Sequence, residues 1–247
     1  MSSGSPRFTV AITGRNFREY AMTCIDSVKD QTFEDFECLV GDDASDDGSA
    51  DLAERLFEGD PRFRVIRWPR HRGAGANMVG LNMLAEGEIV VWLSADDSLF
   101  GDALEVLDFQ YQHFPLCDAT NGSSHAPAGE WHIMKGLMPR RHWQNSLCFA
   151  MPFTWRREVF LRAWRKWRSS MLDPATGDYQ AQAADIALFY PVVAEARSWR
   201  GIRKPLYNFR PPRPGQYDDN FLAKDREIAA RLKTIYHETF TRLAPPA

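Results

Sequence analysis

The chain has 247 residues and a formal net charge of −3, from 33 acidic and 30 basic side chains. A chain of this length can bury a large hydrophobic core without a partner. Its nearly balanced charge excludes a general electrostatic attraction to nucleic acid, and the sequence contains no nucleic-acid-binding motif.

The cysteines and the apolar runs exclude further classes of protein. Cys24, Cys38, Cys117 and Cys148 show neither C-x-x-C pairing nor a histidine spacing, which argues against a zinc ribbon or a redox motif. The first residues contain no apolar signal segment, and the longest plainly apolar run, 89–93, is far shorter than the roughly 20 residues of a membrane helix. We therefore expect reduced thiols and a cytoplasmic protein that does not span a membrane.

Short apolar runs alternate with amphipathic segments in the first half of the chain. This alternation predicts an α/β fold with a mostly parallel sheet, flanking helices and right-handed crossovers. Strands are expected at residues 8–13, 36–41, 63–67 and 88–94. Helices are expected between them at residues 17–30, 49–58 and 76–85.

The second half is less regularly patterned. Turn residues such as Asn121, Gly122 and Pro127 predict mainly irregular structure between residues 116 and 152, with 131–133 as the best strand candidate. Helices are expected at residues 155–169, 180–196 and 221–243.

Polar residues follow three of the predicted strands at the point where each strand ends. They are the segments Thr13-Gly14-Arg15-Asn16, Asp42-Asp43-Ala44-Ser45-Asp46-Asp47-Gly48 and Ser94-Ala95-Asp96-Asp97. Ligands of open parallel sheets bind beyond the carboxyl ends of the strands. We therefore expect the chemistry of this protein at these three segments.

The second of these segments begins with consecutive acids, which repel one another and need a donor or a cation nearby. Asp43 could accept a hydrogen bond from the N–H of a nucleotide base. Asp46 and Asp47 are better explained as caps of the following helix. Because a carboxylate that serves a ligand is dispensable to the core, replacement of Asp43 is expected to weaken nucleotide binding with little effect on folding.

Asp96 and Asp97 follow the run Ile-Val-Val-Trp-Leu, which is hydrophobic enough for a central strand buried on both faces. Mg²⁺ and Mn²⁺ are typically held by one or two carboxylates, with substrate phosphates and waters in the remaining positions. The two aspartates are therefore candidate ligands of such a cation. Alternatively, they form a turn that caps a helix beginning near Gly101.

Two basic segments allow more than one interpretation. The run 70–75, with Arg72 as its candidate side chain, could place positive charge and backbone N–H groups near a diphosphate, although glycine-rich turns are common. The segment 155–168 interleaves tryptophans with arginines, as a basic amphipathic helix. It could contact an anionic membrane or a lipid-linked acceptor. More commonly, such a helix packs its tryptophans on the core and exposes its arginines.

Several segments, taken in order, resemble family-two glycosyltransferases. VAITGRNFREY, QTFEDFECLVGDDASDDGS and AEGEIVVWLSADD look like the nucleotide-binding half of that family. AADIALFYPVVAEA and IRKPLYNFR are similar to its acidic helix and closing strand. The resemblance implies a single domain of GT-A fold, with a nucleotide-binding half at residues 8–115 and an acceptor-side half with a C-terminal helix at residues 116–247.

The resemblance also implies roles for individual residues. The implied nucleotide-binding residues are Thr13, Gly14, Asn16, Asp43, Arg72 and Asp96, with Asp43 holding the base, usually uracil. Asp96 and Asp97 match the motif that binds a divalent metal, Mn²⁺ or Mg²⁺, and the diphosphate. Asp185 matches the aspartate that takes the proton from the acceptor hydroxyl in inverting members.

The sequence departs from the family pattern at two positions. Ser94 stands where the first acid of the usual D-x-D motif is expected, so metal dependence could be looser. Arg15 stands where an aromatic residue often stacks on the base, a role that its planar guanidinium could still fill.

We therefore expect a glycosyltransferase that moves a sugar from a nucleoside diphosphate sugar, foremost a UDP-sugar, to a hydroxyl of a carbohydrate or lipid-linked acceptor with inversion. A sugar nucleotidyltransferase is one alternative, but its glycine-rich phosphate loop is not matched by residues 13–16. The other alternative is a binding module that has lost activity, an interpretation supported by Ser94.

Overall fold

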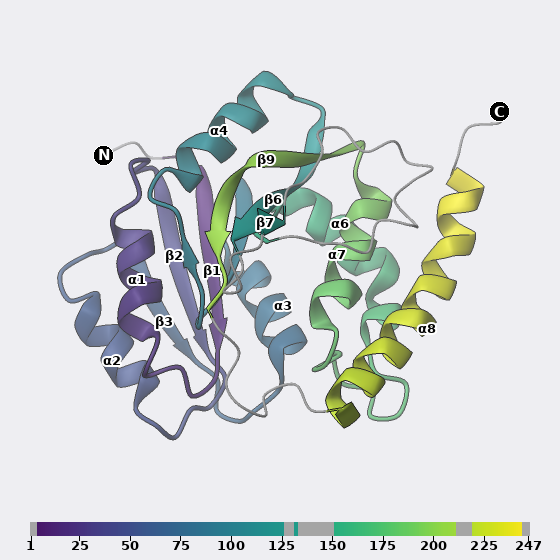
Figure 1. Cartoon of the computed structure of the whole chain (residues 1–247), viewed down its shortest axis with the longest axis horizontal. Coiled ribbons are helices and arrows are strands. Elements are labelled where there is room, and N and C mark those ends of the chain that lie inside the picture. The colour runs from purple at the N-terminus through teal and green to yellow at the C-terminus, as the bar shows by residue number, and fades with distance from the viewer. Residues whose placement is uncertain (1–3, 126–130, 133–150, 211–218, 244–247) are drawn as a thin grey trace.

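The computed structural model describes residues 4–125, 131–132, 151–210 and 219–243. Within these residues the chain forms a nine-stranded sheet with the order β3-β2-β1-β4-β8-β6-β9-β5, and β7 pairs with β6. Helices cover both faces of the sheet (Figure 1). α1, α2 and α4 lie on one face, whereas α3, α6 and α7 lie on the other.

The strands are β1 (Phe8–Gly14), β2 (Phe36–Asp42), β3 (Phe63–Arg67), β4 (Ile89–Ser94), β5 (Ser98–Leu99), β6 (Cys117–His125), β7 (Trp131–His132), β8 (Phe153–Arg156) and β9 (Ser198–Asn208). The helices are α1 (Ala21–Lys29), α2 (Ser49–Leu56), α3 (Ala74–Leu84), α4 (Ala103–His113), α6 (Arg157–Trp167), α7 (Ala184–Glu195) and α8 (Asp219–Leu243), with a short 3₁₀ helix, η1 (Arg168–Met171), after α6.

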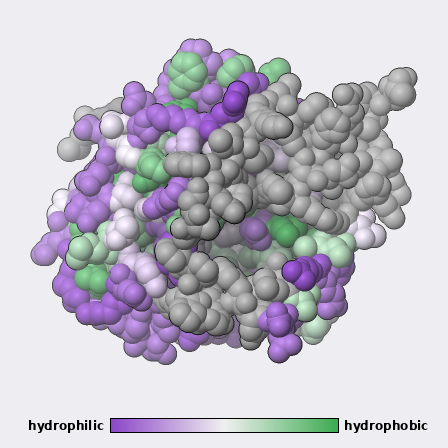
Figure 2. Space-filling model, viewed as in Figure 1, coloured by the Kyte–Doolittle hydropathy of each residue, from purple (hydrophilic) through white to green (hydrophobic). Residues whose placement is uncertain are grey.

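The first half of the chain matches the prediction. β3, β2, β1 and β4 are parallel neighbours, and their bounds agree with the predicted strands to within one residue. α1 and α2 bury their apolar side chains on the sheet, and the surface over these helices is mostly hydrophilic in Figure 2. The register pairs Thr13 with both Gly41 and Ser94, so the polar segments after β1, β2 and β4 meet at one edge of the sheet.

The expectation of irregular structure after residue 116 is wrong for residues 117–125. These residues form β6, which is antiparallel to β8 and parallel to β9, so this part of the sheet is mixed. The strand is buried although it is polar, and three of its polar side chains, those of Asp118, Thr120 and Ser123, have hydrogen-bond partners inside the protein. The Thr154 hydroxyl forms hydrogen bonds with the Thr120 hydroxyl at 2.6 Å and with the Tyr111 hydroxyl at 2.8 Å. Ile133 and residues 126–130 and 134–150 lie outside the described residues.

The predicted helix at residues 155–169 is correct only in its later part. Trp155 belongs to β8, and α6 begins at Arg157. The indole N–H groups of Trp164 and Trp167 donate to the Tyr179 hydroxyl and to Glu195, both at 2.7–2.8 Å. The tryptophans therefore pack inward, while the exposed side chains of α6 include its basic ones. Membrane contact through this segment stays a prediction.

Two further expectations can be compared with the structure. Cys24, Cys38 and Cys117 are free thiols in the interior, and burial raises the pKa of each, so they stay protonated and unreactive. Cys148 lies outside the described residues. None of the helices in the described part of the chain is long and apolar enough to cross a membrane.

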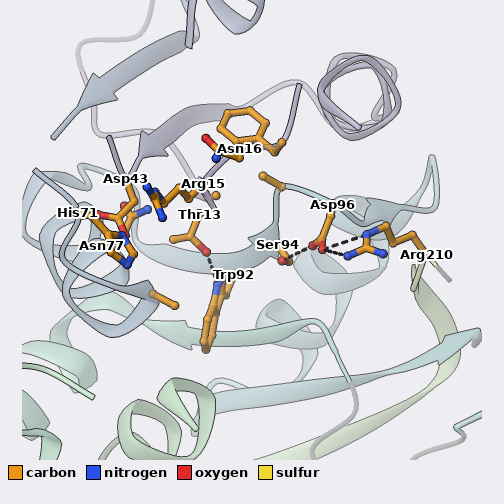
Figure 3. Close-up of a pocket in the computed structure, with 14 residues that line it drawn as sticks. Thr13, Arg15, Asn16, Asp43, His71, Asn77, Trp92, Ser94, Asp96 and Arg210 are labelled. Carbon is orange, nitrogen blue, oxygen red and sulfur yellow. Dashed lines mark hydrogen bonds and ion pairs between the residues drawn. The ribbon is translucent and has the colours of Figure 1, made fainter. Parts of the chain in front are cut away.

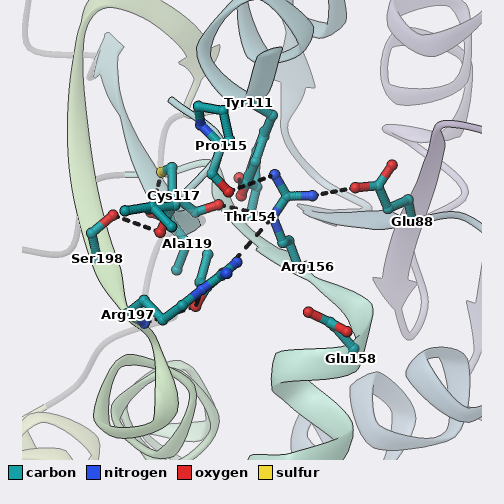
Figure 4. A network of polar contacts seen from close by, with 12 residues as sticks. Glu88, Tyr111, Pro115, Cys117, Ala119, Thr154, Arg156, Glu158, Arg197 and Ser198 are labelled. Atoms are coloured by element: carbon teal, nitrogen blue, oxygen red, sulfur yellow. Dashed lines mark hydrogen bonds and ion pairs between the residues drawn. The ribbon is translucent and has the colours of Figure 1, made fainter. Parts of the chain in front are cut away.

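A network of charged groups joins the two halves of the chain at the edge opposite to the polar strand ends (Figure 4). The fully buried Asp118 of β6 accepts hydrogen bonds from the backbone N–H and the guanidinium Nη2 of Arg197, both at 2.7 Å. Arg156 of β8 donates to the Cys117 carbonyl at 3.0 Å and pairs with Glu88. The contact with Glu88 links β8 to the segment before β4.

We predict that Asp118→Asn lowers the free energy of unfolding by about 1–3 kcal/mol, because an amide cannot accept all the hydrogen bonds that Arg197 donates to a buried carboxylate. Urea denaturation followed by circular dichroism measures the change. Glu158→Gln is the control, because Glu158 is exposed and its contact with Arg162 is 3.7 Å long. Its loss should cost about 0.5 kcal/mol or less. Equal effects of the two substitutions would show that the network contributes little.

Candidate active site

A cavity of about 550 Å³ lies beyond the carboxyl ends of β1, β2 and β4 (Figure 3). Five of the residues predicted from the sequence line it, namely Thr13, Gly14, Asn16, Asp43 and Asp96. The other lining residues are Arg15, Phe17, His71, Ala74, Asn77, Trp92, Ser94, Ala95 and Arg210. The strand-end rule therefore located the cavity correctly.

The loop after β1 is shaped by close packing. A Cβ atom at Gly14 would lie 2.4 Å from the Ala95 Cβ, so a larger residue does not fit between the ends of β1 and β4. Asn16 adopts a left-handed conformation with φ of 53°, which asparagine tolerates better than most residues. Its side-chain Oδ1 accepts the Asp46 backbone N–H at 3.1 Å, and its own N–H donates to the Ser45 hydroxyl at 2.9 Å. The loops after β1 and β2 are thus fixed to each other.

Asp43 is buried, with 3% of its surface exposed, and its carboxylate holds the loop before α3. The backbone N–H groups of Arg72 and Gly73 donate to it at 2.7 and 2.8 Å, and the ring Nδ1 of His71 lies 2.7 Å from it. These contacts argue against the expectation that Asp43 is dispensable to folding. A carboxylate has about four acceptor positions. His71, whose side chain is 53% exposed, is the partner that a base N–H could replace or join.

Arg72 does not line the cavity with its side chain. Its guanidinium lies over the Trp68 indole, 5.5 Å from the ring centroid, and only its backbone N–H contacts Asp43. Gly73 has a φ of +83°, and a Cβ there would lie 2.7 Å from the Ala181 Cβ. The loop at residues 71–75 is consequently packed between Asp43 and the segment that leads into α7.

The carboxylates of Asp96 and Asp97 point in different directions. Asp96 faces the cavity, where its Oδ1 accepts the Ser94 hydroxyl at 2.6 Å and its Oδ2 accepts Nη2 and Nε of Arg210 at 2.7 and 3.0 Å (Figure 3). Asp97 is 9% exposed and accepts the Tyr207 hydroxyl and the Arg210 backbone N–H at 2.7 and 2.9 Å. Burial, and secondly the charge of Asp96, raise the pKa of Asp97 to about 6.

These contacts determine which residues could hold a metal. Among the described residues no three His, Cys, Asp or Glu side chains are grouped closely enough to form a metal site by themselves. The Asp96 carboxylate and the Ser94 hydroxyl offer oxygen ligands at the cavity wall, which suits Mg²⁺ or Mn²⁺ when phosphate oxygens and waters complete the coordination. Asp97, which is buried and is not among the described residues that line the cavity, is the poorer of the two predicted ligands.

Asp185 lies in the first turn of α7 and is not among the described residues that line the cavity. It is half-buried. Burial and, secondly, the negative charge of Asp185 raise the pKa of Tyr190 on the same helix. The residue before the helix, Ala183, has a φ of 51°, an unfavourable backbone conformation for alanine. The contacts of residues 180–181 with the glycines at 73 and 75 bring the start of α7 next to the loop that bounds the cavity.

The sequence alone did not identify several lining residues. Trp92 forms part of the cavity wall, and its indole N–H donates to the Thr13 hydroxyl at 3.0 Å. His71 also lines the cavity, whereas the sequence indicated Arg72 as the candidate side chain of the run 70–75. Arg210 follows β9, so the strand-end rule applied to that strand would have found it.

A parallel first half of the sheet, crossover helices on both faces and a cavity with two aspartates at the strand ends are the features of the GT-A class of fold. Residues 9–160, more than half of the chain, match the family described as Glycosyl transferase family 2. The chain therefore belongs to this family.

Comparisons with individual proteins agree with this assignment. Chondroitin synthase of Pasteurella multocida is 25% identical over 205 residues, which are 82% of this chain and 20% of that protein. Staphylococcus aureus TarS residues 1–349, solved in complex with UDP-GlcNAc, superpose with a TM-score of 0.70 at 16% identity, over 91% of this chain and 66% of that one. The mannosyltransferase PcManGT of Pyrobaculum calidifontis, solved with GDP-Man and Mn²⁺, gives 0.61 at 16% identity, over 97% and 74%. The chain spans less than a third of the first curated relatives that it matches, at 29% and 20% of their lengths.

We predict that Asp43→Ala lowers the free energy of unfolding by about 1–3 kcal/mol without any ligand, because the N–H groups of Arg72 and Gly73 lose their acceptor. Chemical denaturation measures the change. Asp46→Ala is the matched control, because Asp46 is exposed in the same loop and its loss should cost no more than about 0.5 kcal/mol. A wild-type stability in Asp43→Ala would mean that the loop does not depend on this carboxylate.

Proposed function

We propose that this chain transfers a sugar from a nucleoside diphosphate sugar, most favourably a UDP-sugar, to an acceptor hydroxyl with inversion at the anomeric carbon. The observation that carries this proposal is the single cavity that has the carboxylate of Asp43 in one wall and that of Asp96 in another. One carboxylate can accept a hydrogen bond from the base of such a donor, and the other can bind the cation at its diphosphate end. The complex of TarS with UDP-GlcNAc, a protein of similar fold, supports the choice of donor.

The proposed donor contacts follow from the cavity wall. Asp43 accepts an N–H of the base, and the loop with Gly14 and Asn16 lies against the nucleoside. Asp96, assisted by the Ser94 hydroxyl, holds the divalent cation, Mn²⁺ or Mg²⁺, at the diphosphate end. Such a cation, when bound, neutralises the charge that develops on the leaving diphosphate. PcManGT, the relative of similar fold solved with Mn²⁺, supports the cation.

The proposed general base is Asp185. A carboxylate beside the anomeric carbon can take the proton of an alcohol as the alcohol attacks, which gives single displacement and inversion. Support comes from the position of Asp185 at the start of α7, next to the loop at residues 71–75. The acceptor is a carbohydrate or lipid-linked hydroxyl compound.

The two alternatives differ from this proposal in measurable ways. A sugar nucleotidyltransferase would form a nucleotide sugar from a nucleoside triphosphate and a sugar phosphate, and membership of the glycosyl transferase family argues against that reaction. An inactive binding module would bind the donor and never release nucleoside diphosphate. Binding and turnover are therefore tested separately below.

We predict that UDP-sugars stabilise the protein more than GDP-, dTDP- or CMP-sugars do, and that Mn²⁺ increases the effect. A ligand at 100 times its Kd stabilises by about 2.7 kcal/mol, which corresponds to roughly 5–10 °C for a chain of this size. Thermal-shift measurements with Mn²⁺ or EDTA show the difference, and uridine serves as the control that lacks a diphosphate. If none of the nucleotide sugars raises the melting temperature, the proposed function is wrong. An equal shift in EDTA would remove the cation from the proposal.

We predict that Asp185→Asn lowers turnover at least about 10²-fold while the melting temperature and UDP affinity stay near those of the wild type, because the amide keeps the shape but cannot accept a proton. Release of UDP from UDP-GlcNAc, with a panel of oligosaccharide acceptors, measures turnover. Asp178→Asn removes the same charge from an exposed position shortly before α7 and should leave turnover unchanged. Retained activity in Asp185→Asn would exclude Asp185 as the base.

A further inference from the structure

Arg210 forms an ion pair with the cavity-lining carboxylate of Asp96. Its Nη2 and Nε both donate to Oδ2 of Asp96, while the other oxygen of Asp96 accepts the Ser94 hydroxyl. Figure 3 shows these three side chains in one line along the cavity wall. Both oxygens of Asp96 therefore have hydrogen-bond donors, and a cation cannot reach Oδ2 while the guanidinium stays there.

The guanidinium is held in this position by more than one contact. The side chain of Arg210 is only 11% exposed, compared with 27% for Asp96. Its Cζ lies 4.7 Å from the centroid of the Tyr20 ring, and its backbone N–H donates to the buried Asp97. These contacts hold the guanidinium at Asp96 while no ligand is bound.

The charges of the side chains that line the cavity indicate what happens to the ion pair of Asp96 and Arg210 when a cation and a diphosphate bind. Arg15 and Arg210 balance Asp43 and Asp96, so the lining side chains have no net charge if His71 is counted as neutral. A divalent cation alone would leave the cavity with an excess of two positive charges. A diphosphate ester carries two negative charges, so cation and diphosphate together restore the balance.

We propose that Arg210 occupies the position of the divalent cation while the donor is absent and moves to the diphosphate when cation and donor bind together. This inference rests on the proposed function. Asp96 then exchanges a guanidinium for the cation, and the guanidinium pairs with phosphate oxygens, which it can contact through two parallel hydrogen bonds. Ser94, which brings no charge where the family pattern has an acid, fits a site with only one carboxylate to neutralise.

The test measures binding of Mn²⁺ alone and of UDP by titration calorimetry, with Arg210→Gln compared with Arg15→Gln. Both variants remove one positive charge from the same cavity, but only Arg210 contacts Asp96. Arg210→Gln should bind Mn²⁺ alone at least about tenfold more tightly than the wild type, and Arg15→Gln less than about threefold. In saturating Mn²⁺, Arg210→Gln should bind UDP at least about tenfold more weakly.

Each result has a separate meaning. Equal Mn²⁺ affinity in Arg210→Gln and Arg15→Gln would overturn the shared position, and unchanged UDP affinity in Arg210→Gln would overturn the move to the diphosphate. If Arg210→Gln does not fold, Arg210→Lys replaces it, and Mn²⁺ affinity should then rise less than about tenfold but clearly above the wild type. If the wild type binds no UDP at all, the proposed function itself fails. If wild-type binding is normal and the variants show no difference, only the inference about Arg210 fails.

Discussion

The hydrogen bonds that Asp43 accepts from the backbone of Arg72 and Gly73 are the contacts on which the rest of the site depends. They fix the loop before α3, and that loop in turn packs against residues 180–181 at the start of α7. A buried carboxylate directly after β2 thus holds the loop that packs against the segment leading into α7. Because Asp43 also lines the cavity, the residue that organises the loop is the one that would meet the base. Under the proposed function, folding and donor recognition share one side chain.

The first half of the fold was predictable from the sequence because its strands are apolar and α1 and α2 are amphipathic. β6 was not, because Thr120 and its partner Thr154 satisfy their hydroxyls within the interior, and hydrophobic periodicity does not record such pairing. The polar residues at the ends of the predicted strands correctly indicated where the cavity lies. Arg210 was not predicted because it follows β9, which lies outside the regularly patterned first half of the chain, although its side chain contacts Asp96. The inward turn of Asp97 depends on the Tyr207 hydroxyl, which again comes from β9, so no local pattern distinguishes the two adjacent aspartates.

Ser94 and Arg210 are best understood together. Where an acidic pair would attract a cation strongly, residues 94–97 of this chain place one carboxylate, that of Asp96, in the cavity wall, and Arg210 already neutralises it. Burial, and secondly the negative charge of Asp96, raise the pKa of Asp97 to about 6, so a second negative charge next to Asp96 is disfavoured. The charges of the lining side chains therefore balance one another, in agreement with the proposal that the cation and the diphosphate bind together.

The antiparallel pairing of β8 with β4 also bears on how the chain can be divided. A fragment ending near residue 115 would contain the predicted nucleotide-binding half but would leave one side of β4 without a neighbour. That strand includes Val90, Val91 and Trp92, which are buried in the intact fold. An exposed, apolar edge strand with unpaired backbone groups favours intermolecular pairing. We therefore expect a fragment that ends near residue 115 to aggregate, so nucleotide binding by the first half could not be measured without the second half.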